Sequence, residues 1–165
     1  MIWPIAILVG LIVFGSVYWL KPSPRDTRLA ALRLDAIKRK LQVRQFTFKP
    51  DSAKTGVRDE FTGTSYTLMD PSPKKREGGQ LLWRVVGQAG WDTDGLPEGI
   101  AWHNPGTPED AALLSRLLKD LPDDLLLLEV FSNRVTLMPA ENKTATAEAY
   151  EVFLQEVMSS VAGRQ

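Results

Sequence analysis

The sequence predicts an α+β protein with a single N-terminal transmembrane helix, a basic juxtamembrane helix, and a small antiparallel sheet with helices packed on one face. Three observations support this prediction. The first twenty residues contain no charged side chain. Nine basic residues and only two acidic ones follow between positions 21 and 49. Beyond them lie runs of strand-forming residues joined by short turns, and segments with apolar residues at helical spacing. This pattern favours an antiparallel sheet with helices on one face.

Residues 1–20 are predicted to be a membrane anchor. Positions 2–20 form an uninterrupted apolar run, and a helix over this run is roughly 28 Å long, close to the ~30 Å hydrocarbon core of a bilayer. Trp3, Tyr18 and Trp19 stand at its ends, where aromatic rings favour the lipid–water boundary. The run lacks the basic start and the small-x-small cleavage site of a secretory signal peptide, so we expect the anchor to be retained.

The formal net charge of zero hides a strong asymmetry along the chain. Residues 50–165 hold eleven basic and eighteen acidic residues, the reverse of the excess at positions 21–49. Positive charge beside a transmembrane helix stays on the cytoplasmic side. We therefore expect the N-terminus outside and the C-terminal domain in the cytoplasm. The absence of cysteine suits a reducing compartment.

Residues 21–42 are predicted to form the basic amphipathic helix. Ser23 is the expected N-cap, with Pro24 in the first turn and Asp26 near the positive helix end. An apolar stripe follows at helical spacing. Its members are Leu29, Leu32, Ala36, Ile37 and Leu41.

Two interpretations of this helix remain open. In the first, the stripe packs on the domain and the charges form a solvated face. In the second, the basic face holds the helix against anionic lipid headgroups, and each cation contributes about 1 kcal/mol to binding. The candidate headgroup contacts are Lys21, Arg25, Arg28, Arg33, Lys38, Arg39 and Lys40.

Residues 43–165 are long enough for one domain with its own core. Apolar runs and turn signals predict strands and helices in the order strands, helix, hairpin, helix. Residues 50–63 are polar and are expected to form a surface loop. The predicted strands are 43–49, 65–69, 81–86 and a short one at 100–102; a helix follows at 107–121, then a hairpin at 125–138 and a helix at 145–162.

The sequence contains few residues arranged for chemistry. It has one histidine, His103, no cysteine and no phosphate-binding glycine loop. The acidic balance after position 50 lacks the broad positive face of a nucleic-acid binder. We therefore expect no catalytic residue, no cofactor and no metal site. An alternative is a small membrane-bound enzyme that uses the carboxylates of Asp92, Asp94 or Glu98.

Three tryptophans and the histidine surround the Gly-rich centre of the domain. Trp83, Trp91, Trp102 and His103 are candidate partner-binding residues, because tryptophans are enriched where partners dock. The competing interpretation is that these rings only pack in the core or at its rim.

The junction Tyr18-Trp19-Leu20-Lys21-Pro22-Ser23-Pro24-Arg25, followed by the Leu/Arg-rich segment 28–41, resembles a group of uncharacterised single-pass inner-membrane proteins of gammaproteobacteria. The resemblance is clear over about residues 15–45. The group has no assigned activity, so it implies only a bacterial inner-membrane location. Together these observations suggest a membrane-tethered, non-enzymatic module that binds a membrane or cytoplasmic protein, for example as an accessory or assembly factor of a membrane complex. A lipid-responsive module is a further alternative.

Overall fold

The computed structural model describes residues 3–19, 22–57, 59–71 and 79–163. The chain divides into two compact units, Met1–Ala31 and Leu32–Gln165. Each unit is described by itself below.

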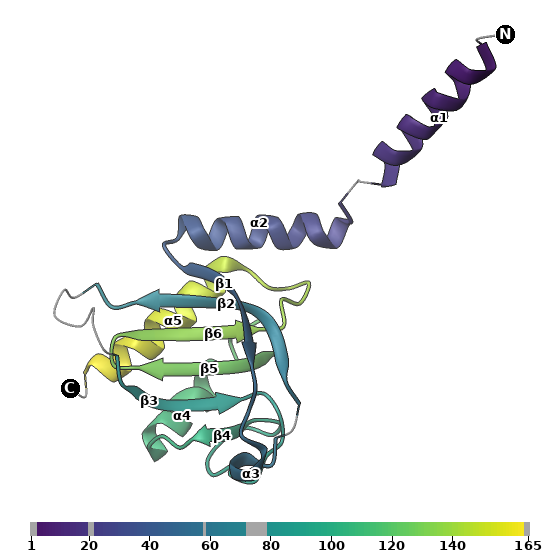
Figure 1. Ribbon diagram of the computed structural model, residues 1–165. Coiled ribbons are helices and arrows are strands. Elements are labelled where there is room, and N and C mark those ends of the chain that lie inside the picture. The colour runs from purple at the N-terminus through teal and green to yellow at the C-terminus, as the bar shows by residue number, and fades with distance from the viewer. Residues whose placement is uncertain (1–2, 20–21, 58, 72–78, 164–165) are drawn as a thin grey trace. The chain divides into compact units, whose positions relative to one another are not determined.

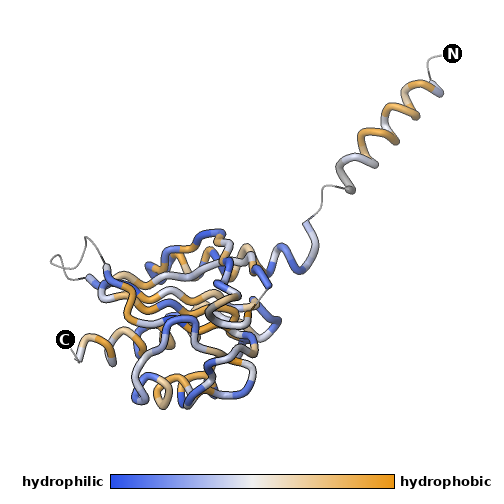
Figure 2. The backbone as a smooth tube through the Cα atoms, turned by 60° about the horizontal axis from the view of Figure 1, so that its bottom comes forward, coloured by the Kyte–Doolittle hydropathy of each residue, from blue (hydrophilic) through white to orange (hydrophobic). Residues whose placement is uncertain are grey.

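The first unit contains helix α1 (Trp3–Trp19), which is apolar over most of its length (Figure 2). Among the described residues, no helix combines the length and the apolar character that crossing a membrane requires. The 17 residues of α1 reach about 25 Å, short of the ~30 Å hydrocarbon core. The predicted transmembrane anchor is therefore wrong. The single-pass inner-membrane location and the topology derived from it are wrong for the same reason.

Helix α2 (Pro24–Lys38) begins as the sequence predicts and ends earlier. The Asp26 N–H donates to Ser23 Oγ at 3.1 Å, and Ser23 Oγ donates to the Asp26 carboxylate at 2.7 Å. At the other end, Lys40 adopts the left-handed conformation with φ 64°. Its N–H bonds to Ile37 O and the Leu41 N–H bonds to Ala36 O, which is the pairing of a Schellman motif. This turn ends the helix and directs the chain into the sheet.

The second unit is α+β and contains a six-stranded sheet in which all neighbours are antiparallel (Figure 1). The strand order is β1-β2-β6-β5-β3-β4, so the last strand of the chain lies between the first hairpin and the rest of the sheet. The strands are β1 (Gln42–Phe48), β2 (Phe61–Met69), β3 (Leu81–Val86), β4 (Ala101–Asn104), β5 (Leu125–Phe131) and β6 (Arg134–Pro139).

Helices α4 (Pro108–Leu117) and α5 (Ala147–Ala162) lie behind the sheet in the view of Figure 1. Helix α5 packs against β6 and β2, where the rings of Tyr66 and Tyr150 approach to 4.8 Å between centroids. Part of the expected surface loop 50–63 is structured. It contains helix α3 (Ser52–Thr55), which contacts β4, and the first residues of β2.

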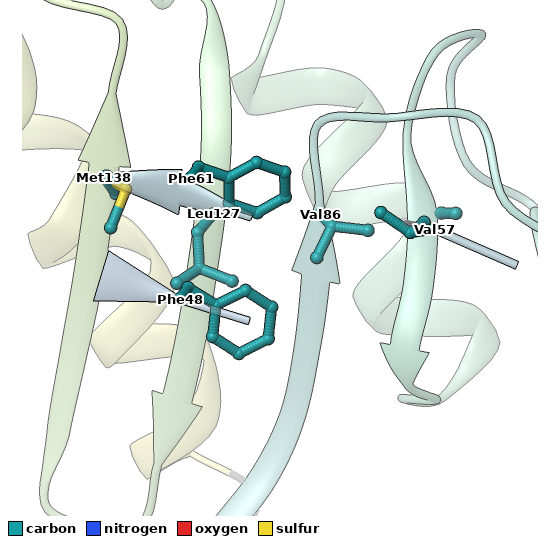
Figure 3. Close-up of a cluster of buried hydrophobic side chains, with 7 residues drawn as sticks. Phe48, Val57, Phe61, Val86, Leu127 and Met138 are labelled. Atoms are coloured by element: carbon teal, nitrogen blue, oxygen red, sulfur yellow. The ribbon is translucent and has the colours of Figure 1, made fainter. Parts of the chain in front are cut away.

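The opposite face of the sheet has an apolar cluster of its own (Figure 3). Figure 1 shows β1 crossing the sheet, which brings Phe48 onto β5 and β3. The Arg84 guanidinium lies over this ring, 5.0 Å from its centroid. The same guanidinium pairs with Glu129 at 2.5 Å. The labelled members of the cluster in Figure 3 are Phe48, Val57, Phe61, Val86, Leu127 and Met138. Both faces of the sheet therefore bury apolar side chains.

Candidate functional site

Of the predicted binding residues, only Trp91 presents a large exposed ring. Trp83 and Trp102 are 2% and 5% exposed, and their rings meet edge to face with centroids 5.8 Å apart. Both side chains belong to the core, as the competing interpretation of the tryptophans proposed. Trp91 is 72% exposed. The four residues therefore do not form one surface.

Trp91 is held on a rigid support. Its N–H donates to Thr55 O at 2.9 Å, which ties the loop to α3. Its ring lies over Gly56, where a Cβ would come within 2.5 Å of Nε1. Gly56 has φ 74° and ends α3, so glycine is required there both for the backbone and for the close approach of the ring. One side of the indole is thus fixed while most of the ring faces solvent.

The acidic loop after Trp91 is fixed by the buried Trp102. The Trp102 N–H donates to Asp92 O at 2.7 Å, and its Nε1 donates to Asp94 O at 3.1 Å. Asp92 and Asp94 line a cavity of about 480 Å³ beside the first turn of α4, whereas Glu98 is not among the residues lining it. All three carboxylate residues are exposed. We define the Trp91 patch as Trp91, Asp92, Asp94 and Glu98.

The arrangement of these carboxylates does not test the enzyme alternative, which stays a prediction. Among the described residues, no group of three or more His, Asp or Glu side chains is placed to hold a metal ion.

His103 has local partners. Its Nε2 accepts from the Asp51 N–H at 3.3 Å, which leaves Nδ1 as the protonated nitrogen that donates to Asn104 Oδ1 at 2.7 Å. The imidazole also meets Phe48 edge to face at 5.3 Å. These contacts fasten β4 to the end of β1, which is a structural role.

The cations expected to face lipid divide into several groups. Arg33 makes a bidentate pair with Glu141, at 2.9 and 2.6 Å. Arg39 bonds to Asp35 at 3.2 Å and to Glu151 at 2.8 Å. Arg25 and Arg28 lie in the first unit, and Lys21 lies outside the described residues.

Lys38 and Lys40 line a surface groove that the sequence reasoning missed, with a volume of about 860 Å³. We call it the α2–α5 groove. Its floor comes from the end of β2, one wall from α5 and the other from the end of α2. The residues are Leu68, Met69 and Pro71 on the floor, Glu151, Gln155, Met158 and Ser159 on α5, and Lys38, Arg39, Lys40 and Gln42 opposite. The signal that could have indicated it is Met158, which falls at helical spacing from the buried residues of α5 but is only half-buried.

A buried polar network secures the α2 end of this region. Tyr66 donates to Glu141 at 2.6 Å, and Tyr150 donates to Asp123. Burial raises the pKa of both tyrosines, and their carboxylate partners raise it further. Burial alone would raise the pKa of Glu141, but the hydrogen bonds from Arg33 and Tyr66 outweigh it and hold the pKa below its usual range. The network therefore keeps the tyrosines neutral and the glutamate charged.

No protein family, no curated protein and no solved structure matches this chain. The resemblance to uncharacterised inner-membrane proteins stays a prediction, and the membrane span that it implies is contradicted by the helix lengths described above. A functional assignment must therefore come from the surfaces of the second unit.

Proposed function

We propose that the unit Leu32–Gln165 is a non-enzymatic protein-binding module whose docking surface is the Trp91 patch. The observation that supports this proposal is the 72% exposure of a tryptophan on a loop that is fixed from beneath. Tryptophan is among the residues that contribute most to binding where proteins dock. An indole left in water at such a position gains the most from a partner that covers it.

The charges around the ring favour a cationic partner. Asp92, Asp94 and Glu98 are exposed beside Trp91 in the chain, and the segment 50–165 has seven more acidic than basic residues. A lysine or arginine over the indole face gains about 0.5–2 kcal/mol from the cation–π interaction, depending on how far it is desolvated. The acidic field also accelerates the encounter with a basic segment. The patch therefore suits a Lys- or Arg-containing peptide segment of a protein.

The support beneath the ring increases the affinity that one residue can provide. Because Gly56, the Thr55 carbonyl and the two Trp102 hydrogen bonds already fix the loop, little backbone freedom is lost when a partner binds. Preorganisation of this kind raises affinity by lowering the entropic cost of association.

Site-specific photo-crosslinking tests the proposal. Benzoylphenylalanine placed at Thr93, an exposed residue of the same loop, is expected to give a discrete protein adduct in cells that express the full chain. The adduct should disappear when Trp91→Ala is added, because the anchor is lost. Trp91 is exposed, so this substitution should change the free energy of unfolding by no more than about 0.5 kcal/mol.

The same probe at Lys143, an exposed residue on the loop before α5, is the matched control and should not give that adduct. The proposal is wrong if no specific adduct forms at Thr93, or if the adduct survives the loss of Trp91 unchanged.

A further inference from the structure

We propose that the α2–α5 groove binds an acidic amphipathic helix of a partner protein. This site is separate from the Trp91 patch and shares no residue with it. The groove has a volume of about 860 Å³.

The floor of the groove is apolar and incompletely covered. Leu68, Met69 and Met158 are each half-buried although they are large hydrophobic side chains. Methionines are flexible and polarizable, and they recur on surfaces that accommodate apolar side chains of partner helices. The floor therefore selects a partner that offers apolar side chains.

The rim of the groove is cationic. Arg39 is neutralised by its bonds to Asp35 and Glu151. Within the described part of the chain, neither Lys38 nor Lys40 pairs with an acidic side chain. Both stand at the C-terminal end of α2, and the Schellman turn presents Lys40 beyond the last helical residue. The rim therefore selects carboxylates, which distinguishes this groove from the acidic Trp91 patch.

The shape of the groove favours a helix over a compact small molecule. The α5 wall presents residues 151, 155, 158 and 159, which share one helical face and extend over about 12 Å, or two helical turns. An occupant of about two to three turns would lie along this wall, as in helix-in-groove recognition.

A defined peptide tests this proposal. The probe is a fluorescein-labelled, hydrocarbon-stapled helix of about 12 residues, with Leu and Met on one face and Glu along both edges of that face. Fluorescence anisotropy with the full chain should show saturable binding. A matched peptide with Gln for every Glu should bind more weakly, and one with Ser for every Leu and Met should not bind. Carbodiimide crosslinking followed by mass spectrometry should join peptide carboxylates to Lys38 or Lys40.

Charge reversal in the protein provides the second half of the test. Lys38→Glu with Lys40→Glu should weaken binding about tenfold or more. Lys119→Glu with Lys143→Glu reverses two exposed lysines outside the groove and should change binding less than about twofold. Trp91→Ala should leave peptide binding unchanged. The proposal for the α2–α5 groove can therefore fail or succeed independently of the proposal for the Trp91 patch.

Three results would overturn the inference: no saturable binding of the acidic peptide, binding that survives the Lys38/Lys40 reversal, or crosslinks that fall elsewhere. Vesicles containing phosphatidylglycerol serve as the competing ligand. If they bind in a Lys38/Lys40-dependent manner and displace the peptide, the groove is an anionic lipid site instead.

Discussion

A single carboxylate, that of Glu141 in the loop before α5, binds side chains of both α2 and β2. It accepts from Arg33 on α2 and from Tyr66 and Thr64 on β2. Its own backbone has φ 58°, a conformation that costs a non-glycine residue about 1 kcal/mol or more. The Asp123 carboxylate accepts the Glu141 N–H at 2.9 Å and holds the turn in place. The contacts of the side chain thus compensate for the strain of the main chain.

Replacing Glu141 by glutamine should lower the free energy of unfolding by about 1–3 kcal/mol at pH 7, because the Arg33 guanidinium loses its charged partner. The pKa of Glu141 is lowered in the folded state from an ordinary value of 4.5. Its contribution is therefore complete above pH 4.5 and is lost as the pH falls through the lower folded-state value. Urea unfolding at pH 7 and pH 3 should show the difference between wild type and Glu141→Gln shrinking in acid.

Glu60→Gln, which changes an exposed residue at the start of the β2 region, is the control and should have little effect at either pH. Equal stability of wild type and Glu141→Gln at pH 7 would show that the Arg33 pair contributes nothing.

The tryptophans illustrate how far single residues could be predicted. Composition and spacing identified all three as candidate binding residues. Trp83 pairs across the sheet with Val130 on β5, and both point toward the helices. Trp91 stands in a loop whose position depends on Gly56, 35 residues earlier in the chain. That dependence on a distant residue is why sequence alone did not separate them.

The best predicted elements are those with a local start signal. The sequence Thr107-Pro108-Glu109-Asp110 gave the first turn of α4, and the structure shows a full capping box there. The apolar stripe of α2 was less reliable. Leu32, Ala36 and Leu41 are buried, but Ile37 is 55% exposed because the helix packs over a narrower face than its apolar residues occupy.

Thr107→Ala should destabilise the second unit by about 1–2 kcal/mol. The Asp110 N–H loses its acceptor in Thr107 Oγ1, and the Asp110 carboxylate, in a residue only 3% exposed, loses the hydroxyl that donates to it at 2.8 Å. Thermal or urea unfolding followed by circular dichroism measures the loss. Thr107→Ser keeps the hydroxyl and should recover most of the stability; a Ser variant as unstable as the Ala variant would contradict the capping argument.

The arrangement of the elements was the least predictable feature. The β5–β6 hairpin follows from local apolar runs and a tight turn, whereas β2 begins at Phe61, inside the expected surface loop. The insertion of β6 between β2 and β5 depends on pairs such as Tyr66 with Leu137, which lie 71 residues apart. Short-range patterns contain no information about such pairs. The α2–α5 groove was missed for the same reason, because β2, α2 and α5 form it together.

At the scale of the whole molecule, the two units differ in how they bury apolar surface. The second unit buries it on both faces of the sheet. Among the side chains of α1 that the structure describes, nine large apolar ones are exposed, from Trp3 at 81% to Val9 at 53%. The apolar run that suggested an anchor is real, but the helix it forms falls short of the length that the prediction required.

Deleting residues 1–19 should leave the unfolding free energy of the second unit within about 0.5 kcal/mol of the full chain, because the described side chains of α1 contribute nothing to a buried core. Urea unfolding monitored by the buried Trp83 and Trp102 measures this. The truncated chain should also aggregate less, since large exposed apolar patches promote association. A marked loss of stability on truncation would show that α1 supports the fold.

The strand order also has a consequence for how the protein is made. The hairpin β1–β2 is complete once Met69 has been synthesised, but its neighbour β6 ends at Pro139, 70 residues later. At 5–20 residues per second, a ribosome needs about 4–14 s to cover that distance. During this interval the nascent hairpin lacks the β5 and β6 residues that complete its apolar cluster. The rings of Phe46, Phe48 and Phe61 therefore stay more exposed to solvent than in the finished fold. A chaperone that binds exposed apolar segments of nascent chains would bind this hairpin until β6 has been synthesised.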